Sequence, residues 1–167
     1  MPYSAKGRQV SFLGSAFQNP DLYANRIAAI NALGEKGLLC TSKVIDKVTG
    51  QTQMIIGDGY QRFLSKYMFG LACGGSCNYM TAKYFQIPAS RSMLVCSDTN
   101  GLDIFPKDTY LKYSVENIDK LCTDVEYFIK NINEAKWRAK ALTNYVLKNH
   151  NHLVRAEQLV SFIRKYL

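Results

Sequence analysis

The sequence has no apolar run long enough to cross a membrane. Its 167 residues contain no stretch of about 18 consecutive apolar residues, the length that a spanning helix needs. The N-terminus, MPYSAKGRQV, also lacks the apolar segment of a secretory signal peptide. The hydrophobic fraction of 47% suffices for a core, and the length fits one domain. We therefore expect residues 1–167 to form a single cytoplasmic domain.

The cysteine pattern indicates neither a disulfide framework nor a metal site. The five cysteines are odd in number and widely spaced. Cys40, Cys96 and Cys122 stand among apolar residues, where a reduced thiol packs as a small hydrophobic group. Cys73 and Cys77 are spaced to bracket a metal, but no second Cys or His pair completes a tetrahedral set. This cysteine usage agrees with a cytoplasmic location and predicts no metal.

The sequence also lacks the familiar signatures of nucleotide-binding and catalytic proteins. It contains no G-x-G-x-x-G and no Walker A sequence. No Ser/His/Asp or Cys/His arrangement can be assembled, because the distances between such residues are unknown at this stage. His150 and His152 are the only histidines, and we interpret them as part of a polar turn between two helices.

An excess of basic residues is what the sequence does have. The formal net charge of +8 suits a polyanionic partner, such as a nucleotide diphosphate, a nucleic acid or the anionic face of a membrane. The basic residues are dispersed and no nucleic-acid recognition motif appears, so a nucleic-acid-binding module is the less favoured alternative. Peripheral contact with a membrane stays open.

The apolar pattern predicts strands that alternate with helices. We expect strands at 9–15, 38–45, 92–97 and 110–113, a helix after the first strand, and a short helix within 78–89. A helix that begins near Asp58 is expected to carry one apolar face, formed by Tyr60, Phe63, Leu64, Tyr67 and Met68. The alternation predicts an α/β fold, a Rossmann-like three-layer domain with a mainly parallel sheet.

The remainder of the chain, from Ser114 onward, has the 3.6-residue period of helices. We expect three helices and therefore a helical C-terminus. The second is expected to turn five residues inward, namely Trp137, Ala141, Leu142, Tyr145 and Val146. The third carries apolar residues at helical spacing, namely Leu153, Ala156, Leu159, Val160 and Ile163.

Ligands of parallel α/β sheets bind at the carboxyl ends of the strands. This rule places the turns at Gly14-Ser15, 74–78 and 97–102 on the candidate binding edge. A glycine after a strand lets backbone N–H groups approach a phosphate, but on the residues alone a plain tight turn is the favoured interpretation of Gly14-Ser15. Gln86 is suited to ribose hydroxyls, and Lys83 and Arg91 to phosphate charge. On the residues alone, a solvated or capping role for all three is the simpler interpretation.

Three segments resemble a family of glycosyltransferases. The stretch AKYFQIPASRSMLVCSDTNGLDIF (82–105) is similar to the K/R-x-F-E-I/A-P/A-A-C-G-x-L-L-L signature, with its following G-L-x-E-L-F, of GT-B enzymes that include the spore-maturation CgeB-like proteins. The opening RQVSFLGSAF (8–17) resembles that family's first strand, and KNHNHLVRAEQLVSFI (148–163) resembles its N-H-T-Y-x-H-R-A-x-x-L-L ending. The three occur in the family's order and are distributed along nearly the whole length of the chain, from residue 8 to residue 163.

The resemblance implies the C-terminal half of a GT-B enzyme, which binds a nucleotide-diphosphate sugar. It implies no essential metal and no cofactor, and it leaves the acceptor to another domain or subunit. By resemblance, Gly14 and Ser15 lie near the diphosphate, and Gln86 stands where many of these enzymes bind ribose with a Glu. Further donor-binding positions implied in this way are Asn78, Lys83, Arg91, Asp98, Gly101 and Leu102.

Two departures from the family pattern leave an alternative open. Gln86 replaces a carboxylate, and a neutral amide loses the charge-assisted hydrogen bond to a hydroxyl. Arg91 occupies the place of a small residue, usually glycine, and its side chain is long enough to reach a phosphate or to block a pocket. The alternative is therefore a degenerate, non-catalytic homologue that binds nucleotides or acts as a scaffold. No catalytic residue is assigned.

Overall fold

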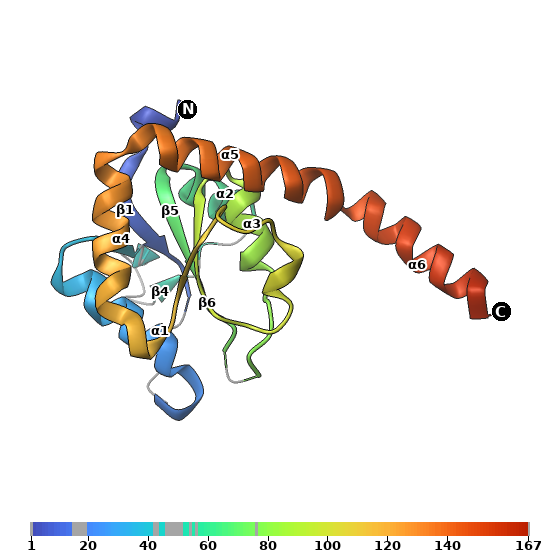
Figure 1. Ribbon diagram of the computed structural model, residues 1–167, viewed down its shortest axis with the longest axis horizontal. Helices are drawn as coiled ribbons and strands as arrows, with labels where there is room; N and C mark the ends of the chain where they lie inside the picture. Colours follow the sequence, from blue (N-terminus) through green and yellow to red (C-terminus); the bar gives the residue numbers. More distant parts are fainter. Residues whose placement is uncertain are drawn as a thin grey trace.

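Five parallel strands form the central sheet, in the order β2-β1-β5-β6-β7. The computed structural model describes residues 2–14, 20–41, 44–45, 52–53, 55, 57–75 and 77–166. The strands of the sheet are β1 (Gly7–Phe12), β2 (Leu39–Thr41), β5 (Tyr67–Ala72), β6 (Met93–Ser97) and β7 (Leu111–Tyr113). A separate antiparallel pair joins β3 (Val44–Ile45) to β4 (Thr52–Gln53). The expected parallel α/β sheet is confirmed (Figure 1).

Helices cover both faces of the sheet and make a three-layer domain (Figure 1). On one face α1 (Pro20–Glu35) packs beside α4 (Ile118–Lys130). On the other face lie α2 (Asp58–Ser65), α3 (Lys83–Ala89) and the α5 helix (Ile132–Asn149). The side chains of β6 alternate between two apolar clusters, with Val95 in the first and Leu94 and Cys96 in the second. The expected burial of this strand on both faces is therefore confirmed, since all five of its residues are buried.

The central strand β5 was not expected, and the predicted helical face of residues 60–68 is wrong in its second half. Helix α2 ends at Ser65, so Tyr67 and Met68 belong to β5 instead. The missed signal is a continuous apolar run, which is typical of a strand covered on both faces. Gly70 within β5 lets α3 approach closely, because a Cβ atom there would lie 2.8 Å from Cγ2 of Ile87.

The loops and C-terminal helices follow the expected order with shifted bounds. Short 3-10 turns occur at η1 (Tyr3–Ala5), η2 (Leu102–Ile104) and η3 (Val115–Asn117). A capping box between Ser114 and Asn117 forms the start of η3. Leu142 and Val146 of α5 are buried as expected, but Trp137 is 63% exposed and its predicted inward position is wrong. The last helix, α6 (His152–Tyr166), extends beyond the domain (Figure 1). Within the described residues, no helix is both long and apolar enough to cross a bilayer.

The contact between Gly70 and Ile87 generates a stability prediction. Gly70→Ala should lower the free energy of unfolding by about 1–3 kcal/mol, because the buried Ile87 side chain of α3 has to shift to admit the methyl group. Gly34→Ala in α1 is the matched control, since no atom lies within 4 Å of its added Cβ. That control should raise stability by about 0.5–1 kcal/mol. Urea denaturation of both variants measures the difference, and equal effects would contradict the proposed close packing.

Candidate functional site

The carboxyl ends of β1 and β5 bound a crevice at the point where the strand order reverses. From β1 the chain crosses through α1 to β2 on one side, whereas from β5 it crosses through α3 to β6 on the other. The two crossover helices therefore lie on opposite faces and leave the edge between β1 and β5 open. Ligands of doubly wound sheets bind at such a switch point.

A cavity of about 590 Å³ opens at this edge, within the size range of small-molecule sites. We call it the edge cavity. It combines side chains from α1, α2 and α3 with the residue that follows β5. Its described lining consists of Arg26, Ile55, Gly57, Tyr60, Gln61, Cys73, Thr81, Ala82, Lys83 and Gln86. Two of these residues are cationic and none is acidic.

Lys83 connects the first helical turn of α3 to the end of β1. Its ammonium donates a hydrogen bond to the Leu13 carbonyl and lies 5.0 Å from the centroid of the Phe12 ring. A Cβ atom at position 14 would lie 2.6 Å from Lys83 Nζ, so Gly14 leaves the space that this ammonium occupies. Burial lowers the pKa of Lys83, and the positive charge of Arg26 lowers it further.

Arg26 is the second cation of the edge cavity, and the sequence analysis did not single it out. Its Nε lies 2.8 Å from the Cys73 sulfur, and its guanidinium lies 4.2 Å from the centroid of the Tyr23 ring. Its position in the sequence could have indicated it, because the helix that follows the first strand of a parallel sheet starts at the binding edge. Tyr60 was also missed as a site residue, and burial raises the pKa of this phenol to about 12.

Gln86 lines the edge cavity one turn after Lys83 on α3, so the structure brings these two predicted residues together with Gly14. Ser15 lies outside the described residues. Asn78 does not line the edge cavity. It is exposed with φ at +47°, and its carbonyl accepts a hydrogen bond of 2.9 Å from the Asn100 amide.

The segment 98–102 has structural contacts of its own. Asp98 is exposed and forms an ion pair of 2.9 Å with Lys112 on β7. Gly101 adopts a left-handed φ of +84° and precedes η2, whereas Leu102 is buried in the second apolar cluster. None of the three lines the edge cavity.

The glycine turn after β5 packs against the turn after β6. A Cβ atom on Gly74 would lie 2.3 Å from Cγ2 of Thr99, and the Gly74 N–H donates to the Ser97 hydroxyl at 3.1 Å. This amide is already used inside the protein. The Gly74 turn therefore packs two loops together. This favours the interpretation as a plain turn over the interpretation as a diphosphate-binding turn.

Arg91 lies at the opposite edge of the sheet, just before β6 and away from the edge cavity. It follows the C-cap of α3 with φ at +58°, a conformation that glycine adopts without strain and that commonly ends a helix. The Arg91 side chain neither reaches nor blocks the edge cavity, since it lines a different pocket.

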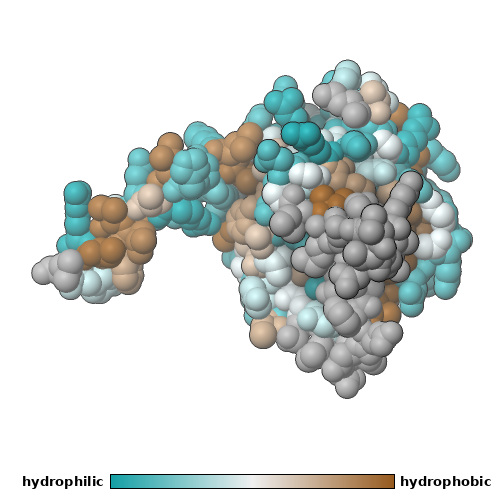
Figure 2. Space-filling model, turned by 180° about the vertical axis from the view of Figure 1, so that it is seen from behind, coloured by the Kyte–Doolittle hydropathy of each residue, from teal (hydrophilic) through white to brown (hydrophobic). Residues whose placement is uncertain are grey.

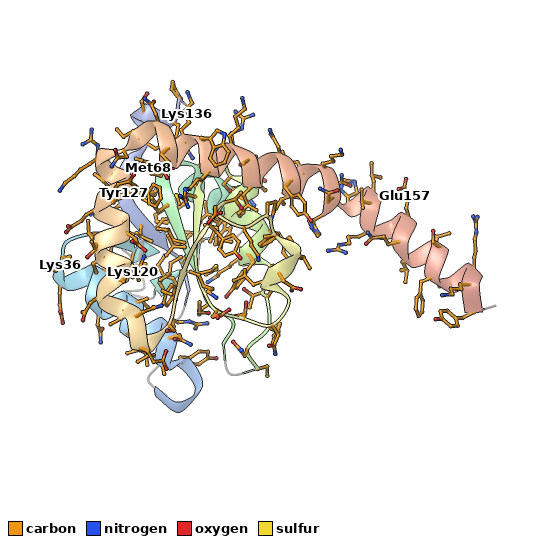
Figure 3. All side chains as sticks on the ribbon, in the orientation of Figure 1. Lys36, Met68, Lys120, Tyr127, Lys136 and Glu157 are labelled. Atoms are coloured by element: carbon orange, nitrogen blue, oxygen red, sulfur yellow. The ribbon has the colours of Figure 1, made fainter. Side chains whose placement is uncertain are left out.

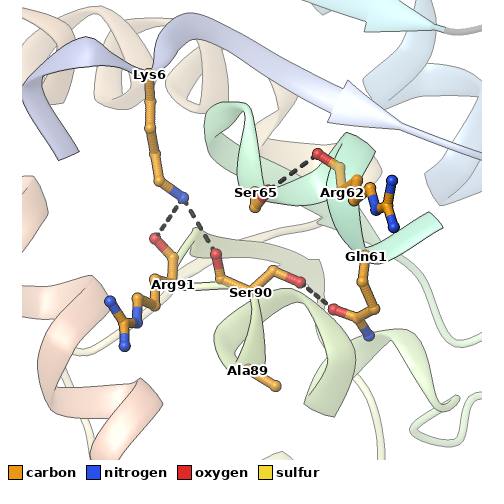
Figure 4. A pocket seen from close by; sticks show the side chains of 7 residues that line it. All are labelled: Lys6, Gln61, Arg62, Ser65, Ala89, Ser90 and Arg91. Carbon is orange, nitrogen blue, oxygen red and sulfur yellow. Dashed lines mark hydrogen bonds between the residues drawn. The ribbon is translucent and has the colours of Figure 1, made fainter. Parts of the chain in front are cut away.

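That second pocket, of about 360 Å³, contains a buried lysine (Figure 4). Lys6 is 6% exposed. Its ammonium donates to the carbonyls of Arg91 at 2.8 Å and Ser90 at 3.2 Å, and to the Ser92 hydroxyl at 3.2 Å. Burial lowers the pKa of Lys6 to about 8, and the charge of Arg91 adds to this effect. Lys6 thus holds the C-terminal end of α3 against the start of β1.

The fold and the edge cavity together describe a doubly wound, Rossmann-like α/β domain with a crevice of about 590 Å³ at the switch point. No family model matches the chain, and no curated protein matches it either. The assignment of a function therefore depends on the geometry of the site and on the resemblance of its sequence.

The lowered pKa of Lys6 generates a prediction on pH. The unfolded chain keeps the Lys6 proton up to about pH 10.5, whereas the folded chain loses it near pH 8. The unfolded state therefore binds more protons in this window, and stability rises with pH. Relative to Lys6→Met, the free energy of unfolding should rise by about 1–2 kcal/mol between about pH 7.5 and 9.5.

Urea denaturation at several pH values measures this slope. Lys140→Met, at an exposed position of α5, is the control and should leave the slope of the parent protein unchanged. Parallel curves for the parent protein and Lys6→Met would show that Lys6 does not titrate in this window.

Proposed function

We propose that this chain is the nucleotide-sugar-binding domain of a GT-B-type glycosyltransferase. The observation that supports it most is the pair of cations, Lys83 and Arg26, in the edge cavity at the switch point of the sheet. Burial disfavours the positive charge of Lys83, and repulsion from the Arg26 guanidinium disfavours it further. A diphosphate group placed between them would relieve this repulsion.

The other lining residues suit the remainder of a nucleotide. The Gln86 amide offers both an acceptor and donors for ribose hydroxyls. The Thr81 hydroxyl has no hydrogen-bond partner among the described residues although its oxygen is buried, so a ligand hydroxyl or phosphate oxygen would satisfy it. Tyr60 and Ile55 add the apolar surface on which a ribose or a base packs.

Sugar transfer needs stabilisation of the diphosphate as it leaves. Cations fixed beside the diphosphate stabilise this developing charge without reorganisation during the reaction. In the proposed enzyme Lys83 and Arg26 have this role, and the acceptor is held by another domain or subunit. The chain by itself then binds its donor without efficient turnover.

Thermal denaturation with a panel of ligands tests the proposal. We expect UDP-, GDP- or dTDP-sugars to raise the melting temperature, and a ligand at a hundredfold excess over its dissociation constant adds about 2.7 kcal/mol of stability. Lys83→Met should abolish the shift, including the shift caused by pyrophosphate alone. Gln86→Ala should weaken the shift with nucleotides but leave the response to pyrophosphate.

Two exposed positions supply matched controls, Lys140→Met on α5 and Gln158→Ala on α6, and neither should alter the shifts. A panel without any shift would contradict the proposal and favour the scaffold alternative. An undiminished shift in Lys83→Met would mean that the nucleotide binds elsewhere. Binding without transfer in the presence of an acceptor domain would identify a degenerate homologue.

A further inference from the structure

The last helix, α6, presents apolar side chains that the rest of the described chain does not cover. Leu153, Val160 and Ile163 expose 63%, 45% and 44% of their surface, and Leu159, Phe162 and Tyr166 expose 60%, 61% and 67%. Apolar atoms gather along this helix where it leaves the domain (Figure 2). Single exposed apolar residues are ordinary, but a contiguous set of them marks an interaction surface.

The spacing of the central residues identifies the shape of the partner. Leu153, Ala156, Val160 and Ile163 alternate steps of three and four residues, which is the pattern of a seam between paired helices. At about 100° of rotation per residue they form a narrow stripe along one side of α6. Leu159, Phe162 and Tyr166 widen the apolar surface on one side of this stripe. The alternating spacing of the stripe itself fits a second helix.

The residues beside this stripe carry complementary charges. Glu157 and Arg164 occupy the same flank at equivalent positions of two successive heptads. Neither forms an ion pair within the described residues. Glu157 points away from α6 beyond the body of the domain (Figure 3). When two identical helices pair in opposite directions, Glu157 of one copy meets Arg164 of the other, and two-fold symmetry repeats the contact.

The bend between α5 and α6 keeps the stripe open. Nδ1 of His150 lies 2.6 Å from an Arg155 guanidinium nitrogen, and the Asn151 side chain accepts a hydrogen bond of 3.0 Å from the Val154 amide. The His150 ring also packs against the rings of Phe85 and Tyr145, with centroids 5.3 Å and 5.4 Å away. These contacts hold the start of α6 at the rim of the domain, so the helix does not fold back on it.

We propose that α6 pairs in antiparallel fashion with α6 of a second copy of this chain. The seam consists of Leu153, Ala156, Val160 and Ile163, and two Glu157–Arg164 pairs set the direction. This interface is independent of the edge cavity and of the donor-binding function proposed above.

Sedimentation of the full chain over a concentration series tests the pairing. A two-heptad interface is small, so we expect a monomer–dimer equilibrium over roughly 1 μM to 1 mM. Val160→Asp should abolish the dimer, because it buries an unpaired carboxylate in the seam. Ser161→Asp, one residue along on the polar side of α6, is the matched control and should still dimerise. Circular dichroism checks that α6 stays helical in both variants.

The charged flank supplies a second test that does not disturb the seam. Glu157→Arg replaces two attractive contacts by two repulsive ones and should raise the dissociation constant about tenfold, and Arg164→Glu should do the same. The double variant E157R/R164E recreates both pairs and should restore the dimer. Only self-pairing predicts that the double variant restores the dimer, because both copies then carry the exchanged charges. An unrelated partner would keep its original charges.

Three results would overturn the proposal. These are a parent protein that stays monomeric at every concentration, a dimer that survives Val160→Asp, and a double charge variant as weak as the single ones. Binding of the monomer to anionic lipid vesicles, without self-association and lost in Val160→Asp, would assign the apolar stripe to a membrane instead.

Discussion

The right-handed crossover between parallel strands is the constraint on which this structure depends. A strand–helix–strand unit packs back on its sheet in one hand only. Because the chain moves from β1 toward one side and from β5 toward the other, α1 and α3 have to cover opposite faces. The edge between β1 and β5 is left uncovered for this reason, and the edge cavity lies there.

Within that cavity the surroundings of Lys83 disfavour its positive charge. Lys83 loses hydration and lies near Arg26, and both effects disfavour its charged form. Gly14 leaves space for the ammonium, and the Leu13 carbonyl accepts its hydrogen bond. The other buried lysine, Lys6, meets three acceptors at the end of α3 within 3.2 Å and has a structural role. Among the described residues the Lys83 ammonium has one hydrogen-bond acceptor, the Leu13 carbonyl, and the proposed diphosphate would add a second partner.

How far the sequence predicts the fold depends on how local each signal is. The strand at 92–97 was predicted because a run buried on both faces is apolar at every position. The equally buried β5 was missed because its first residues continue the helical period of α2 and because Gly70 weakens the strand pattern. The place of Arg91 away from the edge cavity follows from its position at the left-handed end of a helix, which nothing in a single sequence shows.

The sequence by itself determined the alternation of strands and helices, the parallel class of the sheet and the order of its loops. These follow from the period of apolar residues and from turn residues, which act over a few positions. Only the tertiary structure decided that Lys83, Gly14 and Arg26 converge, and that the apolar stripe of α5 is buried while that of α6 is open. Both outcomes depend on distances between segments far apart in the chain, and local spacing carries no information about such distances.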